Sequence, residues 1–316
     1  MSNDKLISVD AEIFNLTNES ETIEGFAFKN DNVRIVNHGE MISEINNDAV
    51  LNFLNCPTTK VYIKVDEYDT EHTTKIIAHN FVAHETIEIT KLGDHILAMN
   101  EILLQAKNKR KELKVNPDAE IISNEMIQNL NGLLLRKKLG EVGIGKYRDV
   151  DYYGKPCHVQ VASMDHGSLI PIKEWQPVPG GNGNVPRLMD KLVNWVNSDE
   201  FRQMDPLLRA VKFHSTFIHI HPFRDGNGRT GRMLLNYMLS ISGLRLTNII
   251  AADSEEYFKA NAEAIVNKNY KPLMDIVKKH QIRYSRELYA AVVKYNKERE
   301  RKLTLLGCQV DEFNNN

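Results

Sequence analysis

The chain has 316 residues, of which 42% are hydrophobic and 26% charged, so it is a globular protein of one or two domains that needs neither disulfides nor a structural metal to bury a core. Its 40 Lys and Arg against 42 Asp and Glu leave a formal net charge of -2, which argues against nucleic acid as a partner. Three widely spaced cysteines and no apolar run of membrane-spanning length favour a cytoplasmic protein without a membrane partner.

The first 90 residues differ in pattern from the rest. Residues 30–55 are rich in Asn and Asp, whereas the runs at 60–65, 74–79 and 86–90 have the β-branched composition of strands. We therefore expect residues 1–90 to form a small mixed region of their own.

From Asp94 the apolar spacing predicts helices. Asp94 is a candidate N-cap for the first, the basic stretch at 107–114 is interpreted as its solvated end, and Ser123 caps the second. Further helices are expected at 187–197 and from Leu207 onwards, and the next one is expected to end at Gly243. Three more are expected at 255–266, 272–280 and 283–306.

The segment between the second and third helices is β-prone and rich in glycine. Residues 146–153 and 157–161, separated by Gly-Lys-Pro, predict a hairpin. The glycine-rich run at 179–184 precedes no Gly-Lys-Ser/Thr, so we interpret it as a connector and not as a phosphate loop.

The most informative stretch is Ile-His-Pro-Phe-Arg-Asp-Gly-Asn-Gly-Arg-Thr-Gly-Arg at 220–232. A helix delivers the chain to His221, Pro222 prevents it from continuing, and the glycines of 225–228 allow a tight turn before a new helix near Arg229. Such a turn directs free backbone N–H groups and the positive end of a helix dipole at one point, which is a ready site for phosphate.

The side chains of this stretch fit phosphorus chemistry. Arg229 and Arg232 lie three residues apart on one helix side and offer guanidinium groups to phosphate oxygens. Asp225 suits Mg²⁺ that bridges those phosphates, and His221 can accept a proton from a nucleophile. Together they indicate transfer of a phosphorus group from a nucleotide. A metal hydrolase built on His214, His219 and His221 is disfavoured, because residues two apart at a helix end need not converge.

The stretch resembles the signature of the Fic (Fido) family, His-x-Phe-x-(Asp/Glu)-Gly-Asn-Gly-Arg-x-x-Arg, at every specified position. The resemblance extends over about 121–280 and implies a mainly α fold, with a Fic-type helical core, a β-hairpin flap and a small mixed N-terminal region. It implies an Mg²⁺- and ATP-dependent protein adenylyltransferase that moves AMP to a Ser, Thr or Tyr hydroxyl of a target protein docked on the flap near 146–161.

The family pattern also assigns residues. His221 would be the base and Asp225 the Mg²⁺ ligand. Tyr257 and Asn261, on one face of a later helix, could border the adenine or pack in the core. The nucleotide's phosphates would lie among Asp225, Gly226, Asn227, Gly228, Arg229, Thr230, Gly231 and Arg232.

Members of the family are often silenced by a helix that reads (Ser/Thr)-x-x-x-Glu-(Gly/Asn), and this chain has such a pattern at Ser20 to Gly25. Ser20 and Glu24 share one helix face, and the Glu24 carboxylate could pair with Arg232 in place of the γ-phosphate. We therefore expect autoinhibition by a helix near 15–25.

The resulting organisation is a regulatory region at 1–90, a Fic catalytic domain at 91–281 and a C-terminal helix with a frayed tail at 282–316. Three alternatives stay open: a Fic enzyme that uses another nucleotide, one that removes AMP, and a toxin–antitoxin-like binding module. A homo-oligomer is also compatible with the sequence.

Overall fold

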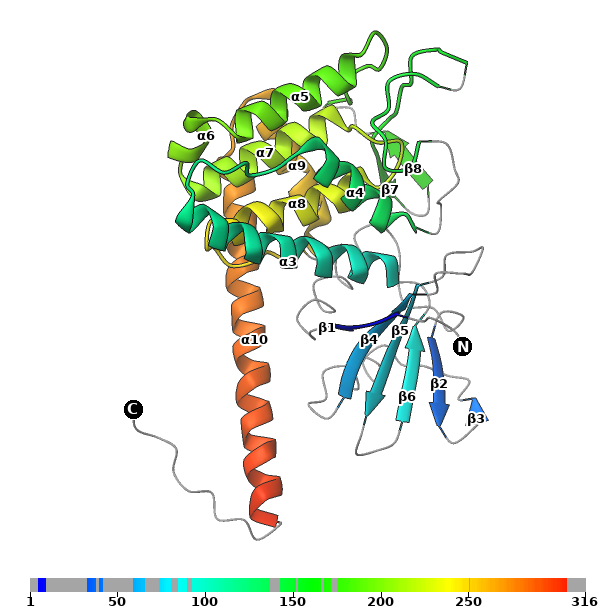
Figure 1. Ribbon diagram of the computed structural model, residues 1–316, viewed down its shortest axis with the longest axis vertical. Helices are drawn as coiled ribbons and strands as arrows, with labels where there is room; N and C mark the ends of the chain where they lie inside the picture. Colours follow the sequence, from blue (N-terminus) through cyan, green and yellow to red (C-terminus); the bar gives the residue numbers. More distant parts are fainter. Residues whose placement is uncertain are drawn as a thin grey trace.

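The computed structural model describes residues 5–9, 33–37, 40–41, 59–65, 74–80, 85–89, 93–136, 143–151, 153–165, 168–171, 175–249 and 251–305. In these residues a helical bundle lies beside an antiparallel sheet, and one long helix extends away from the bundle (Figure 1). The predicted mainly α fold class is confirmed. The predicted inhibitory helix near 15–25, with Ser20 and Glu24, lies outside the described residues.

The N-terminal region contributes a six-stranded antiparallel sheet in the order β1-β4-β5-β6-β2-β3. Its strands are β1 (Lys5–Val9), β2 (Val33–Asn37), β3 (Glu40–Met41), β4 (Thr59–Val65), β5 (Thr74–Asn80) and β6 (Glu85–Ile89). The three predicted strands are confirmed as β4, β5 and β6. Strands β1 to β3 were not predicted, because their partners lie far along the chain, as in the pair Ile7 and Ile63.

The helical part follows the predicted order. Its helices are α3 (Gly93–Val115), α4 (Asn124–Leu134), α5 (Asn184–Val196), α6 (Asp199–Gln203), α7 (Pro206–Ile220), α8 (Asn227–Ile241), η3 (Ala251–Asp253), α9 (Ser254–Val266) and α10 (Lys271–Leu305). Local caps confirm several boundaries: the Ser123 hydroxyl accepts from the Met126 amide at 3.2 Å, and the Asp205 carboxylate accepts from the Leu207 and Leu208 amides. Gly243, with φ +74, follows α8 as predicted.

Helix α8 forms the centre of the core. It packs against α3, α4 and α7, and its apolar side chains, such as Leu234 and Leu235, are fully buried. Tyr237 adds a hydrogen bond of 2.6 Å from its hydroxyl to the Ile121 carbonyl. Helix α3 also contacts β4 and β5, so it joins the bundle to the sheet. Any chemistry at the start of α8 is therefore held on a rigid element.

Three element predictions need correction. The expected helices at 272–280 and 283–306 are one helix, α10, because no glycine or proline interrupts the sequence between them. Helix α3 runs through the basic stretch to Val115 and begins at Gly93, so Asp94 lies in its first turn and is not the cap.

The hairpin predicted for 146–161 is the third correction. The regular hairpin, β7 (Ala162–Asp165) and β8 (Ser168–Pro171), lies further along the chain. Among the described residues of the predicted segment there is one bridge, between Val150 and Pro156. Its turn is closed by the Asp151 carboxylate, which accepts from the Tyr153 and Lys155 amides at 2.9 Å each, so side-chain contacts replace part of the strand ladder.

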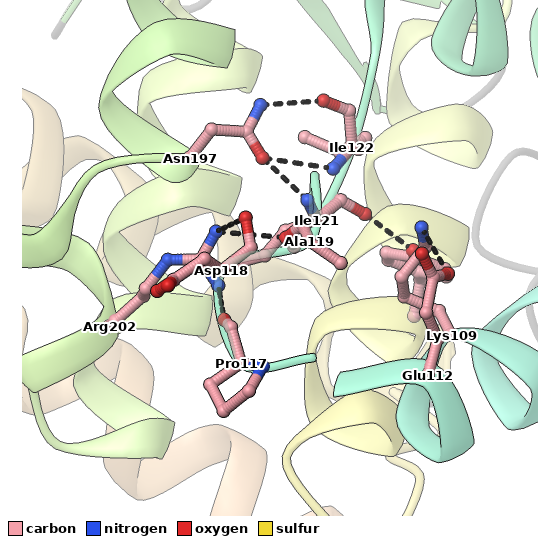
Figure 2. Close-up of polar contacts among 10 residues, drawn as sticks. Lys109, Glu112, Pro117, Asp118, Ala119, Ile121, Ile122, Asn197 and Arg202 are labelled. Carbon is pink, nitrogen blue, oxygen red and sulfur yellow. Dashed lines mark hydrogen bonds and ion pairs between the residues drawn. The ribbon is translucent and has the colours of Figure 1, made fainter. Parts of the chain in front are cut away.

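The connector between α3 and α4 is fastened by side chains from α6 and from the residue that follows α5, as Figure 2 shows. The Arg202 guanidinium donates to the carbonyls of Pro117 at 2.5 Å and Ala119 at 2.9 Å. The Asn197 amide oxygen accepts from the Ile121 amide at 2.5 Å, and its NH₂ group donates to the Ile122 carbonyl at 2.8 Å. These contacts fix where α4 begins, and α4 in turn contacts the motif loop described below.

Replacing Asn197 with alanine is expected to lower the free energy of unfolding by about 1–3 kcal/mol, because it leaves buried backbone groups of the connector unpaired. Chemical denaturation measures this loss. Asn194, which is exposed on the same helix, is the matched control, and Asn194→Ala should change stability little. Equal stability of the two variants would contradict the anchoring role of Asn197.

Candidate active site

The 220–232 stretch forms the junction between α7 and α8. Helix α7 ends at Ile220, and His221 follows in the left-handed conformation with φ 52 and ψ 59. Gly226 also has positive φ, 77, and helix α8 begins directly after it, two residues earlier than predicted. The first intrahelical hydrogen bond runs from the Thr230 amide to the Gly226 carbonyl at 2.8 Å. The first amides of a helix, here those of Asn227 and Gly228, point out of its N-terminus, which is the geometry of an anion site.

His221 lies at the edge of this anion site in a state suited to a base. Its Nδ1 lies 3.2 Å from the Ile218 carbonyl, and because a carbonyl only accepts, Nδ1 carries the proton. The other ring nitrogen, Nε2, is then the acceptor. The pKa of His221 is lowered to about 4, mainly by burial and in addition by the nearby Arg148 charge, while the Ile218 hydrogen bond and Asp225 act in the opposite direction. The imidazole is therefore neutral near pH 7.

The charged side chains of the turn lie around the same amides. Asp225 accepts from the Gly226 amide at 2.6 Å and forms an ion pair of 3.6 Å with Arg229, four residues on. The Asp225 side chain is 44% exposed, whereas that of Arg229 is 13% exposed. Arg232, one turn further along α8, is buried. A neutral base, a carboxylate, two arginines and a helix N-terminus are thus carried by one loop and the first turns of the helix that follows it.

Comparison with known proteins gives this loop a family. Residues 121–239 match the model of the Fic/DOC family. These residues are a Fic/DOC domain.

The relatives each match a part of this chain. The protein adenylyltransferase Fic of Drosophila grimshawi is 37% identical over 81 residues, which is 26% of this chain and 17% of that protein. The protein of the same name from Drosophila ananassae is 44% identical over 66 residues, or 21% of this chain and 13% of that protein. The chain thus spans less than a fifth of the length of these relatives. The solved structure of Fic-1 from C. elegans has a TM-score of 0.46 and 22% identity over 64% of this chain and 52% of that one.

Two asparagines hold the motif loop of the Fic domain in shape. The Asn227 side chain accepts from the Phe223 amide at 2.8 Å and donates to the Phe223 carbonyl at 2.9 Å, so it closes the loop from within. Asn131, on α4, donates to the Asp225 carbonyl at 3.1 Å and the Thr230 hydroxyl at 3.2 Å. Sequence reasoning did not identify Asn131, although a lone amide among the leucines of an apolar helix face was the available signal.

Arg148 supports the backbone of the site through several hydrogen bonds, and its role was not identified from the sequence. It is 2% exposed and donates to four carbonyls: Cys157 at 2.8 Å, Val178 at 2.6 Å, Ile220 at 3.1 Å and His221 at 2.8 Å. Two of these belong to the C-terminal end of α7, where a cation is favoured by the helix dipole. Its own amide also donates to the Pro222 carbonyl at 2.7 Å. Arg148 therefore positions the backbone that carries His221.

The flap segment at 146–161 lies against the motif loop. The Arg224 guanidinium donates to the Val150 carbonyl at 3.2 Å, while the side chains of Val150 and Tyr153 are 44% and 81% exposed. On its other side, the Asp149 carboxylate accepts from the amides of Gly181 at 2.9 Å and Gly183 at 2.8 Å. The glycine-rich run thus cradles a carboxylate of the protein itself at the start of α5, consistent with its interpretation as a connector.

Thr230, Gly231, Tyr257 and Asn261 face the interior. A Cβ on Gly231 would lie 2.8 Å from Ile218, so glycine is needed where α8 meets α7. His214 bonds the Gly231 carbonyl through Nδ1 at 2.9 Å and the Tyr257 hydroxyl through Nε2 at 2.8 Å, and burial lowers its pKa to about 4. Tyr257 and Asn261 are each 2% exposed, and contact of these two with an adenine stays a prediction.

The site offers one carboxylate to a metal. In the described residues there is no group of three His, Cys, Asp or Glu side chains that can hold an ion. Asp225 fits Mg²⁺ nevertheless, because Mg²⁺ is commonly held by one or two carboxylates together with substrate phosphates. Within the same part of the chain, no helix is long and apolar enough to cross a membrane.

Proposed function

We propose that this chain is a protein adenylyltransferase, which transfers AMP from ATP to a Ser, Thr or Tyr hydroxyl of a target protein. The observation that carries the proposal is the neutral His221, with Nε2 as the acceptor, next to the N-terminus of α8 and its two arginines. The name of the Drosophila relatives, which are 37% and 44% identical to parts of this chain, supports it.

The geometry suggests how the chain's own residues contribute. The amides at the start of α8 bind phosphate oxygens of ATP, and Arg229 and Arg232 place the triphosphate. His221 Nε2 accepts the proton of the target hydroxyl as its oxygen bonds to the α-phosphorus; the bond from that phosphorus to the bridging oxygen breaks and pyrophosphate leaves. Asp225 would hold Mg²⁺, which when bound neutralises charge on the phosphates.

The flap is the proposed docking place of the target. Its segment 146–161 is tied to the motif loop through Arg224 and yet exposes Val150 and Tyr153. An extended target segment that lies along it would present its hydroxyl to the base. We place the reaction in the cytoplasm because the cysteine usage fits a reducing compartment.

We further propose that the enzyme is autoinhibited by the N-terminal segment that contains Ser20 and Glu24. Support comes from the inhibitory motif in the sequence and from the position of Arg232 in the first turns of α8, where a carboxylate would compete with the γ-phosphate. This step is independent of the transfer chemistry.

Replacing Glu24 with glycine is therefore expected to raise AMP transfer by about tenfold or more, the gain of one released charge-assisted contact. The measurement uses ATP labelled on the α-phosphate, with lysate as the source of targets and with self-labelling scored separately. Glu21, three residues earlier, supplies the control variant Glu21→Gly, which should behave as wild type. Equal labelling by wild type and Glu24→Gly would contradict the proposed autoinhibition but not the proposed transferase activity.

Parallel reactions with labelled CTP, GTP and UTP test the nucleotide. If one of these labels protein and ATP does not, that nucleotide is the substrate, and the proposed roles of the loop residues are unchanged. If Glu24→Gly labels neither itself nor any lysate protein with any of the four, the transferase proposal fails, and a binding role or the removal of AMP takes its place.

A further inference from the structure

A second pocket lies at the opposite end of α8 from the motif. It has a volume of about 550 Å³ and lies among α3, the last turn of α8 with the loop that follows it, and α10. Figure 1 shows α3 passing α10 on that side of the bundle. Helix α8 has 15 residues, so at about 1.5 Å per residue the pocket is roughly 20 Å from the motif. The pocket is therefore separate from the proposed active site.

The pocket is lined by five cationic side chains: Lys107, Arg110, Lys111 and Lys114 from α3, and Arg245 from the loop after α8. The four on α3 are spaced three and four residues apart, so they share one face of the helix. No carboxylate is among its lining residues in the described part of the chain. In a protein with a net charge of -2, this is a marked local excess of positive charge.

This arrangement opposes the stability of the helix itself. Like charges at these spacings each destabilise a helix by about 0.2–0.5 kcal/mol. Elsewhere the chain follows the favourable pattern, with ion pairs four residues apart such as Lys259 with Glu255. Even on α3 the nearby Glu112 pairs with Lys109 at 2.8 Å, as Figure 2 shows, and does not line the pocket.

Stabilisation of the helix C-terminus does not explain the cluster. A cation is favoured in the last turn, which accounts for Lys114. That effect fades beyond one turn, so it does not reach Lys107, two turns earlier. The sequence-based interpretation of a solvated helix end also does not account for Arg245. This residue lies more than 130 positions further along the chain and lines the same pocket.

The remaining lining defines the ligand class. Tyr284, 7% exposed, and the leucines of the loop give one side of the pocket an aromatic and aliphatic surface opposite the cations. The volume lies within the roughly 300–1,000 Å³ typical of small-molecule sites, and a concave pocket suits a compact anion better than a duplex. We propose that this pocket binds a small molecule that carries a chain of two or more phosphates. The proposal does not depend on the adenylyltransferase activity.

Isothermal titration of the full chain with inorganic tripolyphosphate, and separately with ATP and GTP, tests the pocket. The double variant Lys111→Gln/Arg245→Gln removes two exposed cations and is expected to weaken tripolyphosphate binding by about tenfold or more. Lys191→Gln/Lys259→Gln removes the same charge from exposed positions on α5 and α9 and is the matched control, which should bind as wild type. Thermal unfolding verifies that all variants are folded.

The outcomes separate the sources of the ligand. A pocket-dependent site for tripolyphosphate alone supports an inorganic polyphosphate, and one that is tighter for ATP or GTP supports a nucleotide. Equal losses in the pocket and control variants would reduce the effect to overall charge and overturn the proposal. It is also overturned if wild type does not bind tripolyphosphate, or if only duplex DNA binds in a pocket-dependent way.

Discussion

Replacing His221 with alanine is expected to lower the rate of AMP transfer by about 10²–10⁴-fold, the usual contribution of a general base. ATP should still bind, because the amides at the start of α8 and the arginines are untouched. Single-turnover labelling in the Glu24→Gly background, together with ATP titration, separates the two effects. Loss of ATP binding in His221→Ala, or transfer at the wild-type rate, would contradict its role as the base.

The pH profile adds a second test of the same residue. Because burial lowers the pKa of His221 to about 4, the neutral base is present above that pH and is lost only as pH falls through about 4. Transfer should therefore be nearly constant from pH 5.5 to 8. An unperturbed imidazole with a pKa near 6.5 would instead give about a tenfold rise over this range. A rise centred near pH 6.5 would contradict the buried environment assigned to His221.

Replacing Arg148 with methionine is expected to cost about 3 kcal/mol or more of unfolding free energy and to abolish most transfer. The substitution keeps much of the side-chain volume but leaves four carbonyls, including that of His221, without their donor. The left-handed backbone of His221 would then lose its support, and the base its position. Denaturation and single-turnover labelling measure the two losses.

Two further variants separate positioning from charge. Arg148→Lys keeps the charge but lacks the guanidinium fork, so we expect it to recover stability in part and to leave transfer slow. Lys191→Ala changes an exposed residue on α5, outside the flap and the motif loop, and should alter neither quantity. If Arg148→Met unfolds at the wild-type denaturant concentration, the hydrogen bonds of Arg148 to the four carbonyls are not needed for the fold. If Arg148→Lys transfers at the full rate, the charge alone is sufficient.

Local features of the chain were predicted because their physical causes lie within a few residues. Ser123 and Asp205 cap the helices that directly follow them, and Gly243 takes the positive φ that ends α8. The motif loop is of the same kind: Pro222 and Gly226 determine its turn, and α8 starts where the turn ends. The base and the phosphate-binding helix end could therefore be identified from contiguous residues.

Contacts between distant residues were not predicted in the same way. Arg148 reaches the His221 carbonyl across 73 positions, and Asn131 reaches the Asp225 carbonyl across 94. A buried arginine has no local pattern, because its partners are backbone carbonyls that any residue carries. Strands β1 to β3 belong to the same class, since a strand is stabilised by a neighbour that the sequence does not specify.

By itself, then, the sequence determined most of the helices, the mainly α fold and the chemistry of the 220–232 loop, because capping, turn geometry and charge spacing are local properties. The tertiary structure decided what supports that loop and what the basic stretch of α3 faces. Only the packing of α8 and α10 against α3 brings Arg245 and Tyr284 to Lys107 and Lys111. The basic stretch is part of the linear pattern, whereas the pocket that it lines is formed between separate elements, and so the pocket could not be predicted from the sequence.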